Sequence, residues 1–263
     1  IQADGTTTFN VNSANGGTMA SDLGGTFSSV ENLTGGSDDD TFNIASGASL
    51  DGAIDGGGGT NDTLTQADGT NAFDVTGADA GSVTDVAGGF SAVENLTGGS
   101  DSDTFTIGSG ATLTGVIDGG GGDDTIVQTD GTNTFDITGG DSGDVTDIGS
   151  FTDVDNVTGG SGDDTFDFNA GTLTGNVDGG AGSNTIQLDD NPNTINVTGA
   201  DSGTATPVGG TFSNVGNIDG GSDDDDFTIG SGGSLSGSIT GGGQTATDSL
   251  TQTDGTNAFN ING

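Results

Sequence analysis

The chain has 263 residues, of which 56 are glycine and 40 are aspartate or glutamate, and it contains no Lys, Arg, His, Cys, Trp or Tyr, so its formal charge is −40. Without Lys or Arg it cannot neutralise phosphates, which excludes nucleic acid as a partner and makes an anionic membrane surface repulsive. Disulfides, thiolate metal sites and histidine ligands are also excluded, so hard cations bound by oxygen, such as Ca²⁺, are the metal chemistry left.

Catalysis and membrane insertion find no support in the composition. The usual catalytic bases, nucleophiles and oxyanion-binding cations are missing. Paired carboxylates such as Asp123 and Asp124 recur wherever the turn recurs, and an enzyme needs one special site. No apolar run approaches the roughly 20 residues that span a bilayer. We therefore expect no enzyme and no membrane span.

A ten-residue pattern recurs along the chain at a nearly constant spacing. It reads QADGTTTFNV from Gln2, QADGTNAFDV from Gln66, QTDGTNTFDI from Gln128 and QTDGTNAFNI from Gln252, with a divergent copy from Leu188. Few apolar residues and high charge are also typical of disorder, but a disordered chain has no reason to keep such a period. Fixed periods of this kind indicate a solenoid.

We predict one continuous solenoid over residues 1–263. Its repeats are 3–66, 67–128, 129–188 and 189–252, with a partial repeat at 253–263.

A shorter period lies inside each long repeat, with three of these short units to each long one. It is marked by a turn glycine and by one aliphatic residue two positions before that glycine. We predict that these aliphatic residues form a single inward column, one per winding of the backbone. They are Val11, Leu33, Ile54, Val75, Leu96, Ile117, Ile137, Val157, Val177, Val197, Ile218, Ile239 and Ile261.

The segments beside the turns alternate between apolar and polar residues, as strands do. Phe42 and Ile44 flank Asn43, and Phe73 and Val75 flank Asp74. A second turn lies midway between successive turn glycines, so each coil is predicted to run strand, turn, strand, turn. The predicted fold class is all-β: a parallel β-solenoid, a flattened two-sheet β-roll or β-helix. It would have about 13 coils of roughly 20–21 residues each, three per long repeat.

One residue conflicts with this alternation. Val93 and Leu96 are three positions apart, which gives Glu94 the parity of an inward residue. We expect a bulge there that turns Glu94, and its counterpart Glu31, outward.

The turns of the second and third coil in each long repeat are rich in Gly and Asp. The turns at 119–127, GGGGDDTIV, and at 159–167, GGSGDDTFD, fit every fixed position of the repeats-in-toxin nonapeptide G-G-x-G-x-D-x-U-x. Other turns, such as GGSDDDTFN at 35–43, fit most of it. The chain therefore resembles the calcium-binding β-roll repeats of this family, as found within large bacterial surface adhesins and filaments.

The resemblance implies Ca²⁺ bound between successive coils by backbone carbonyls and by the Asp two residues before the inward apolar residue. Carried over by position, that Asp is Asp40, Asp62, Asp103, Asp124, Asp164 or Asp225, with a shifted candidate at Asp248; Asp38, Asp101 and Asp223 stand where the motif has its third glycine.

Departures from the family pattern limit the number of expected ions. The motif occurs once per coil rather than in tandem, and Asn184 replaces the Asp in the third repeat. Electrostatics favours cations independently, because carboxylates about 5 Å apart repel by about 1 kcal/mol per pair in water. Asp and Gly are also ordinary turn formers, so a merely solvated acidic edge remains the alternative.

The expected function is a structural repeat segment of a secreted or cell-surface bacterial adhesin or matrix filament. Both ends of the sequence are in phase with the repeat and neither carries a polar cap, so we expect end-to-end self-association or continuation into a longer array. The alternative is a binding surface for ice, carbohydrate or another ligand on an outward Thr/Asp row. That row comprises Thr34, Asp55, Thr76, Thr97, Asp118, Thr138, Thr158, Asp178, Thr198, Asp219 and Thr240.

Overall fold

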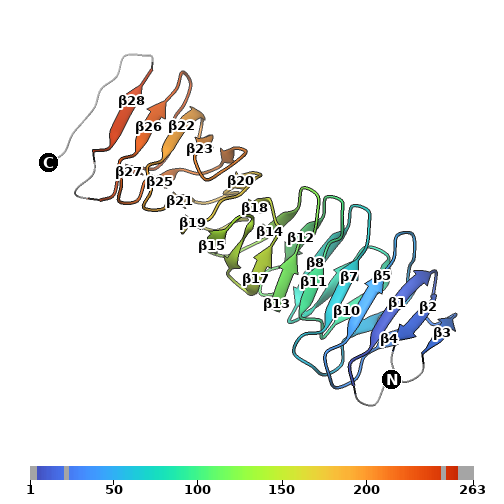
Figure 1. Cartoon of the computed structure of the whole chain (residues 1–263). Helices are drawn as coiled ribbons and strands as arrows, with labels where there is room; N and C mark the ends of the chain where they lie inside the picture. Colours follow the sequence, from blue (N-terminus) through green and yellow to red (C-terminus); the bar gives the residue numbers. More distant parts are fainter. Residues whose placement is uncertain (1–4, 21–23, 244–246, 254–263) are drawn as a thin grey trace. The chain divides into compact units, whose positions relative to one another are not determined.

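The computed structural model describes residues 5–20, 24–243 and 247–253, and these residues form 28 β-strands and no helix (Figure 1). They belong to two compact units, each described by itself. Unit 1 comprises Ile1–Asp130 and Asp141–Val157, and unit 2 comprises Gly131–Gly140 and Thr158–Gly263. Ile261, the last residue of the predicted column, and nearly all of the partial repeat 253–263 lie outside the described residues.

The strands are short and follow one another with tight connections. In unit 1 they are β1 (Thr8–Ser13), β2 (Gly16–Ala20), β3 (Gly25–Ser28), β4 (Leu33–Thr34), β5 (Thr41–Ile44), β6 (Ile54–Asp55), β7 (Thr63–Gln66), β8 (Ala72–Gly77), β9 (Ala80–Val83), β10 (Val86–Ser91), β11 (Asn95–Thr97), β12 (Thr104–Ile107), β13 (Leu113–Asp118), β14 (Thr125–Gln128), β16 (Ser142–Val145) and β17 (Ile148–Thr152), with β18 (Asn156–Thr158) at the boundary. In unit 2 they are β15 (Thr134–Gly139), β19 (Thr165–Phe168), β20 (Val177–Asp178), β21 (Thr185–Gln187), β22 (Thr194–Gly199), β23 (Ser202–Ala205), β24 (Phe212–Ser213), β25 (Asn217–Asp219), β26 (Asp226–Ile229), β27 (Ile239–Thr240) and β28 (Ser249–Gln252).

Each unit contains two sheets, here called sheet A and sheet B. In unit 1 the order is β16-β17-β13-β11-β7-β5-β1-β2-β3 in sheet A and β14-β12-β8-β9-β10-β6-β4 in sheet B. In unit 2 it is β27-β25-β21-β19-β15 in sheet A and β28-β26-β22-β23-β24-β20 in sheet B. The chain alternates between the sheets, so that β5 pairs with β7 and β4 with β6, both in parallel. The predicted fold class, an all-β parallel solenoid of two sheets, is confirmed.

In three of the long repeats the first segment is a three-stranded antiparallel meander rather than a winding. β8, β9 and β10 pair antiparallel within sheet B of unit 1. The chain reverses after β8 at Asp79, whose φ of 48° lies in the left-handed region that Asp tolerates better than most residues. Gly81 stands opposite Val75 in the middle strand, where a Cβ would collide with the carbonyl of Asp74. The meander therefore depends on a glycine that lets two strands approach. The same arrangement joins β1 to β2 and β3 in unit 1, and β22 to β23 and β24 in unit 2.

The prediction of a single column with one aliphatic residue per winding is wrong. In unit 1, Leu33 and Ile54 are partners in sheet B, whereas Leu96 and Ile117 are partners in sheet A. From the β1 meander the chain crosses between the sheets to β4, β5, β6, β7 and then to the β8 meander. Because the number of crossings is odd, the β1 meander lies in sheet A and the β8 meander of the next long repeat lies in sheet B. The shorter period of the sequence therefore counts sequence repeats and not windings.

The apolar residues predicted to point inward do form the core. Phe73, Val75, Phe105 and Leu96 of unit 1 have no exposed surface. Three of the long repeats stack the Phe of the first meander strand on the Phe of the next strand in the same sheet, with ring centroids 4.7 Å apart for Phe73 and Phe105, and in the fourth Ile195 stands opposite Phe227. The parallel register puts like residues side by side, so the flat rings repeat at the spacing of the strands. The equivalent pairs are Phe9 with Phe42 and Phe135 with Phe166, each at 5.0 Å.

Candidate functional site

The Gly/Asp turns at the edge of the solenoid bury six of the predicted aspartates, whereas the shifted candidate Asp248 is exposed. The buried ones are Asp40, Asp62, Asp103, Asp124, Asp164 and Asp225. The carboxylate of each one folds back over the first glycine of its own turn. A Cβ on Gly35 would overlap Asp40 Oδ2, and a Cβ on Gly98 would overlap Asp103 Oδ2. The first glycine of the motif is therefore needed because the aspartate side chain occupies the space that its own side chain would take.

The buried carboxylates are linked through the backbone into chains that we call ladders. In ladder 1 (Thr7, Asp40, Asp62 and Glu94), the N–H of Thr7 donates to Asp40 Oδ1 at 2.6 Å, and the N–H of Asp40 donates to Asp62 Oδ1 at 2.6 Å. The N–H of Asp62 donates in turn to Glu94 Oε2 at 2.8 Å. Each carboxylate thus satisfies a backbone N–H of the neighbouring strand, a group that would be costly to leave buried without a partner.

Ladder 2 (Asn71, Asp103, Asp124 and Asp155) repeats this arrangement in unit 1. The N–H groups of Asn71 and Asp103 donate to Asp103 Oδ1 and Asp124 Oδ1, both at 2.7 Å. The N–H of Asp124 donates to Asp155 Oδ2 at 2.8 Å. The side-chain amide of Asn71 adds bonds to Asp103 Oδ1 at 2.9 Å and to the carbonyl of Gly98 at 3.0 Å.

Unit 2 contains two more ladders. Ladder 3 consists of Asn133, Asp164 and Asn184, and ladder 4 of Asn193, Asp225 and Asp248. The N–H of Asp164 donates to Asn184 Oδ1 at 2.9 Å, and the N–H of Asp225 donates to Asp248 Oδ1 at 3.1 Å. An amide therefore replaces a carboxylate in ladder 3 without loss of the acceptor.

Glu94 points inward, contrary to the prediction of a bulge that turns it out. Only 8% of its surface is exposed, whereas its counterpart Glu31 is exposed as predicted. The inward orientation is favoured because the buried N–H of Asp62 needs an acceptor, and Glu94 supplies it. Asp155 has the same role in the next repeat.

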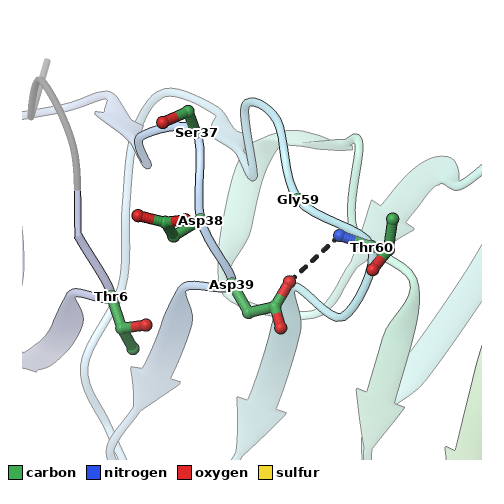
Figure 2. Close-up of a pocket in the computed structure, with 6 residues that line it drawn as sticks. All are labelled: Thr6, Ser37, Asp38, Asp39, Gly59 and Thr60. Atoms are coloured by element: carbon green, nitrogen blue, oxygen red, sulfur yellow. Dashed lines mark hydrogen bonds between the residues drawn. The ribbon is translucent and has the colours of Figure 1, made fainter.

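Asp38, Asp101 and Asp223 lie on the exposed side of the turns. Asp38 Oδ2 accepts the N–H of Gly5 at 2.8 Å, and Asp101 Oδ2 accepts that of Gly69 at 2.9 Å. Figure 2 shows the pocket around Asp38, where Asp39 Oδ1 accepts the N–H of Thr60 at 3.0 Å. That hydrogen bond lowers the pKa of Asp39 below its ordinary value.

Burial makes five of the ladder carboxyls difficult to ionise, because it raises their pKa. Desolvation, and after it the neighbouring carboxylates, raises the pKa of Asp62 to about 6, and the pKa of Asp124 likewise to about 6. Desolvation also raises the pKa of Asp103, Asp164 and Asp225. One oxygen of each of four ladder carboxylates is buried without a hydrogen-bond partner. These atoms are the Oδ2 atoms of Asp62, Asp103, Asp164 and Asp225.

The buried ladder carboxylates do not fit the built Ca²⁺ site that the sequence resemblance implies. Calcium in proteins takes six to eight oxygen ligands. In the described ladders one carboxylate oxygen already accepts a backbone N–H, so each position offers at most one further oxygen. Among the residues that the structure describes, no group of three or more acidic residues is arranged to hold a metal ion. Exposed turn carboxylates remain accessible to cations from solution.

The Asn residues that begin three of the ladders were not singled out from the sequence. Asn71, Asn133 and Asn193 are each at least 96% buried, and each donates through its backbone N–H to the next carboxylate. The recurring Asn that precedes the strand of the ten-residue pattern is the signal that could have identified them.

The outward Thr/Asp row does not form one face. In unit 1, Thr34 and Asp55 are neighbours on sheet B, whereas Thr97 and Asp118 are neighbours on sheet A. Because the chain crosses between the sheets an odd number of times in each long repeat, the row is split between the two sheets, as the aliphatic residues are. The row therefore does not form the single flat surface on which the alternative function, binding of ice or carbohydrate, was based.

No protein-family model, curated protein or solved structure matches this chain. In the parts of the chain that the structure describes, no helical segment has the length and apolar character needed to cross a bilayer.

Proposed function

We propose that the chain is a structural repeat segment of an extracellular bacterial adhesin or surface filament. The observation that supports this most directly is the recurrence of one arrangement, a two-sheet winding with a buried carboxylate ladder, in every long repeat. A catalytic site would need one repeat to differ from the others in chemistry. Repeating the same hydrogen bonds instead lets the solenoid extend in length with the same stabilising contacts between neighbouring windings.

The composition suits an extracellular location. A chain without Lys or Arg offers no cleavage site to trypsin-like proteases. Its charge of −40 is unopposed within the chain, so counter-ions must come from the medium. We propose that Ca²⁺, which is millimolar outside cells, provides this screening at exposed turn carboxylates such as Asp38 and Asp101.

Cation dependence provides the first test of this proposal. The melting temperature of the chain in low-salt buffer with a chelator is expected to rise by several degrees in millimolar CaCl₂, because divalent ions reduce repulsion between turn carboxylates. NaCl at equal ionic strength is the control and should raise it less. An equal melting temperature with chelator and with Ca²⁺ would remove Ca²⁺ from the proposal and leave the solenoid intact.

Location and mechanical role are tested on the cells that produce the protein. Antibodies against the repeats should label intact cells, and tethered molecules pulled by atomic force microscopy should lengthen in steps that correspond to repeats. Labelling that requires cell lysis would contradict the proposed function.

A further inference from the structure

The third position of ladders 1, 2 and 3 provides an internal comparison between a carboxyl and an amide. Asp62 in ladder 1, Asp124 in ladder 2 and Asn184 in ladder 3 occupy equivalent places in the repeat. In all three, Oδ1 accepts the backbone N–H of the first ladder aspartate, at 2.6, 2.7 and 2.9 Å respectively. The three side chains therefore have the same orientation, and their second terminal atoms can be compared directly.

The second atom of Asn184 is a hydrogen-bond donor. Its Nδ2 donates to the carbonyl oxygen of Asn214 at 2.9 Å. Asn214 has a φ of 55°, and this left-handed conformation precedes the buried Val215. The carbonyl oxygen of Asn214 therefore faces the second terminal atom of the ladder side chain at position 184.

The same carbonyl recurs beside Asp62 and Asp124. Ala92 and Asp153 have left-handed φ values of 49° and 51°, and each precedes a buried valine as Asn214 does. A Cβ on Gly56 would collide with both the Ala92 carbonyl oxygen and Asp62 Oδ2, and a Cβ on Gly119 with both the Asp153 carbonyl oxygen and Asp124 Oδ2.

A Cβ on Gly179 would likewise meet both the Asn214 carbonyl oxygen and Asn184 Nδ2. In ladders 1 and 2, then, a carboxyl oxygen takes the place of the amide nitrogen.

Two oxygens in this place repel each other unless one of them carries a proton. Asp62 Oδ2 is buried and has no hydrogen-bond partner when treated as a carboxylate oxygen. A carboxylic acid has one O–H donor and one carbonyl acceptor, which is the pattern that the amide of Asn184 uses. Protonation would therefore satisfy both atoms.

We infer that, in mildly acidic solution, Asp62 and Asp124 are uncharged carboxylic acids in the folded chain, that each then donates its proton to the carbonyl oxygen of Ala92 or Asp153, and that neither is a calcium ligand. This inference does not rest on the proposed function. The groups around Asp62 are Glu94, Asp40 and Asp39. Those around Asp124 are Asp103, Asp155 and Asp123. All of these side chains are acidic, so their charges add to desolvation in favouring the neutral form, whereas the backbone N–H groups of Asp40 and Asp103, which donate to Asp62 and Asp124, favour the charged form less strongly than desolvation opposes it.

Asp40, in the same ladder as Asp62, has the opposite requirement. Its Oδ1 accepts the N–H of Thr7 and its Oδ2 accepts the N–H of Gly36 at 2.5 Å. Both oxygens accept backbone N–H groups, and an amide cannot replace them because its nitrogen is a donor. An amide should therefore be tolerated at position 62 and not at position 40.

The pH dependence follows from the two raised pKa values. Burial raises the pKa of Asp62 and Asp124 from 3.8 to about 6, so this contribution to stability is complete below 3.8 and is lost as the pH rises through 6. Raising the pH from 5 to 7.5 is expected to lower the folding equilibrium constant about tenfold for each of the two carboxyls. Mild acid should therefore stabilise the chain.

The test uses the full chain carrying D62N and D124N together, with urea unfolding followed at pH 5 and pH 7.5, with Ca²⁺ and with chelator. We expect the double variant to be more stable than the parent at pH 7.5 and to lose most of the parent's gain on acidification. At pH 5 the infrared difference between parent and variant should contain a carboxylic-acid carbonyl band.

Three controls separate the inference from a general effect of charge. D144N with D190N removes two exposed carboxylates, and the pH dependence should persist. D40N should destabilise the chain at both pH values. N184D should lower stability at pH 7.5 and add pH dependence. The inference is overturned if the D62N/D124N variant is less stable than the parent at pH 7.5, or if Ca²⁺ protects the parent and not that variant.

Discussion

Replacing Phe105 by Ala is expected to lower the free energy of unfolding by about 3–5 kcal/mol, one of the largest effects of any single substitution in this chain. The Phe105 ring has no exposed surface and stacks on Phe73 with centroids 4.7 Å apart. Its removal would leave a cavity in a core that is thin, because glycine and polar residues form most of each winding. The strands on both sides, β8 and β14, would lose a neighbour that they meet in register.

The measurement is urea unfolding followed by circular dichroism. Thr106 is the matched control, since it lies next to Phe105 on β12 and is not fully buried. Thr106→Ala should change the free energy of unfolding by less than about 1 kcal/mol. Similar losses for the two variants would mean that Phe105 is not in the core.

Replacing Gly56 by Ala is expected to cost about 3 kcal/mol, at the upper end of what overpacking usually costs. The added Cβ would overlap the carbonyl oxygen of Ala92 and Asp62 Oδ2. The first of these is a backbone atom in the bend between β10 and β11, so it cannot rotate away as a side chain can. Relief would require the turn to move apart from its neighbour, which would break the hydrogen bond from Asp40 N–H to Asp62 Oδ1.

Gly77 supplies the control for Gly56. A Cβ there would come no closer than 3.8 Å to any neighbour, namely the Cβ of Ala80. Gly77→Ala should therefore leave the melting temperature within a few degrees of the parent, whereas Gly56→Ala should lower it strongly. If both variants melt at the same temperature, the close packing of glycine against the ladder is contradicted.

Local patterns in the sequence were sufficient to predict the strands and the orientation of the turn aspartates. Phe42 and Asp40 share parity, and both are buried. The same holds for Phe105 with Asp103 and for Ile126 with Asp124. Alternation is a property of the extended backbone itself, so it can be read without knowledge of the partner strand.

The role of the buried aspartates could not be predicted from their positions in the sequence. A carboxylate turned inward at a Gly-rich bend suits a cation as well as it suits a backbone N–H. Only the neighbouring strand decides, because it brings the N–H of Asp40 to Asp62 and the carboxylate of Glu94 to the N–H of Asp62. Glu94 was misjudged for the same reason, since its partner lies 32 residues away in the sequence.

The sequence by itself determined that this protein is an acidic, repetitive, all-β chain that winds between two sheets, because period and parity are local properties of an extended backbone. Only the tertiary structure decided that the first segment of a repeat folds back as a meander, as β8, β9 and β10 do, which divides the aliphatic residues between two sheets. That choice depends on whether β9 pairs with β8 and β10 or continues to the other sheet. Pairing between strands is a long-range interaction, and the shorter period of the sequence is compatible with either outcome.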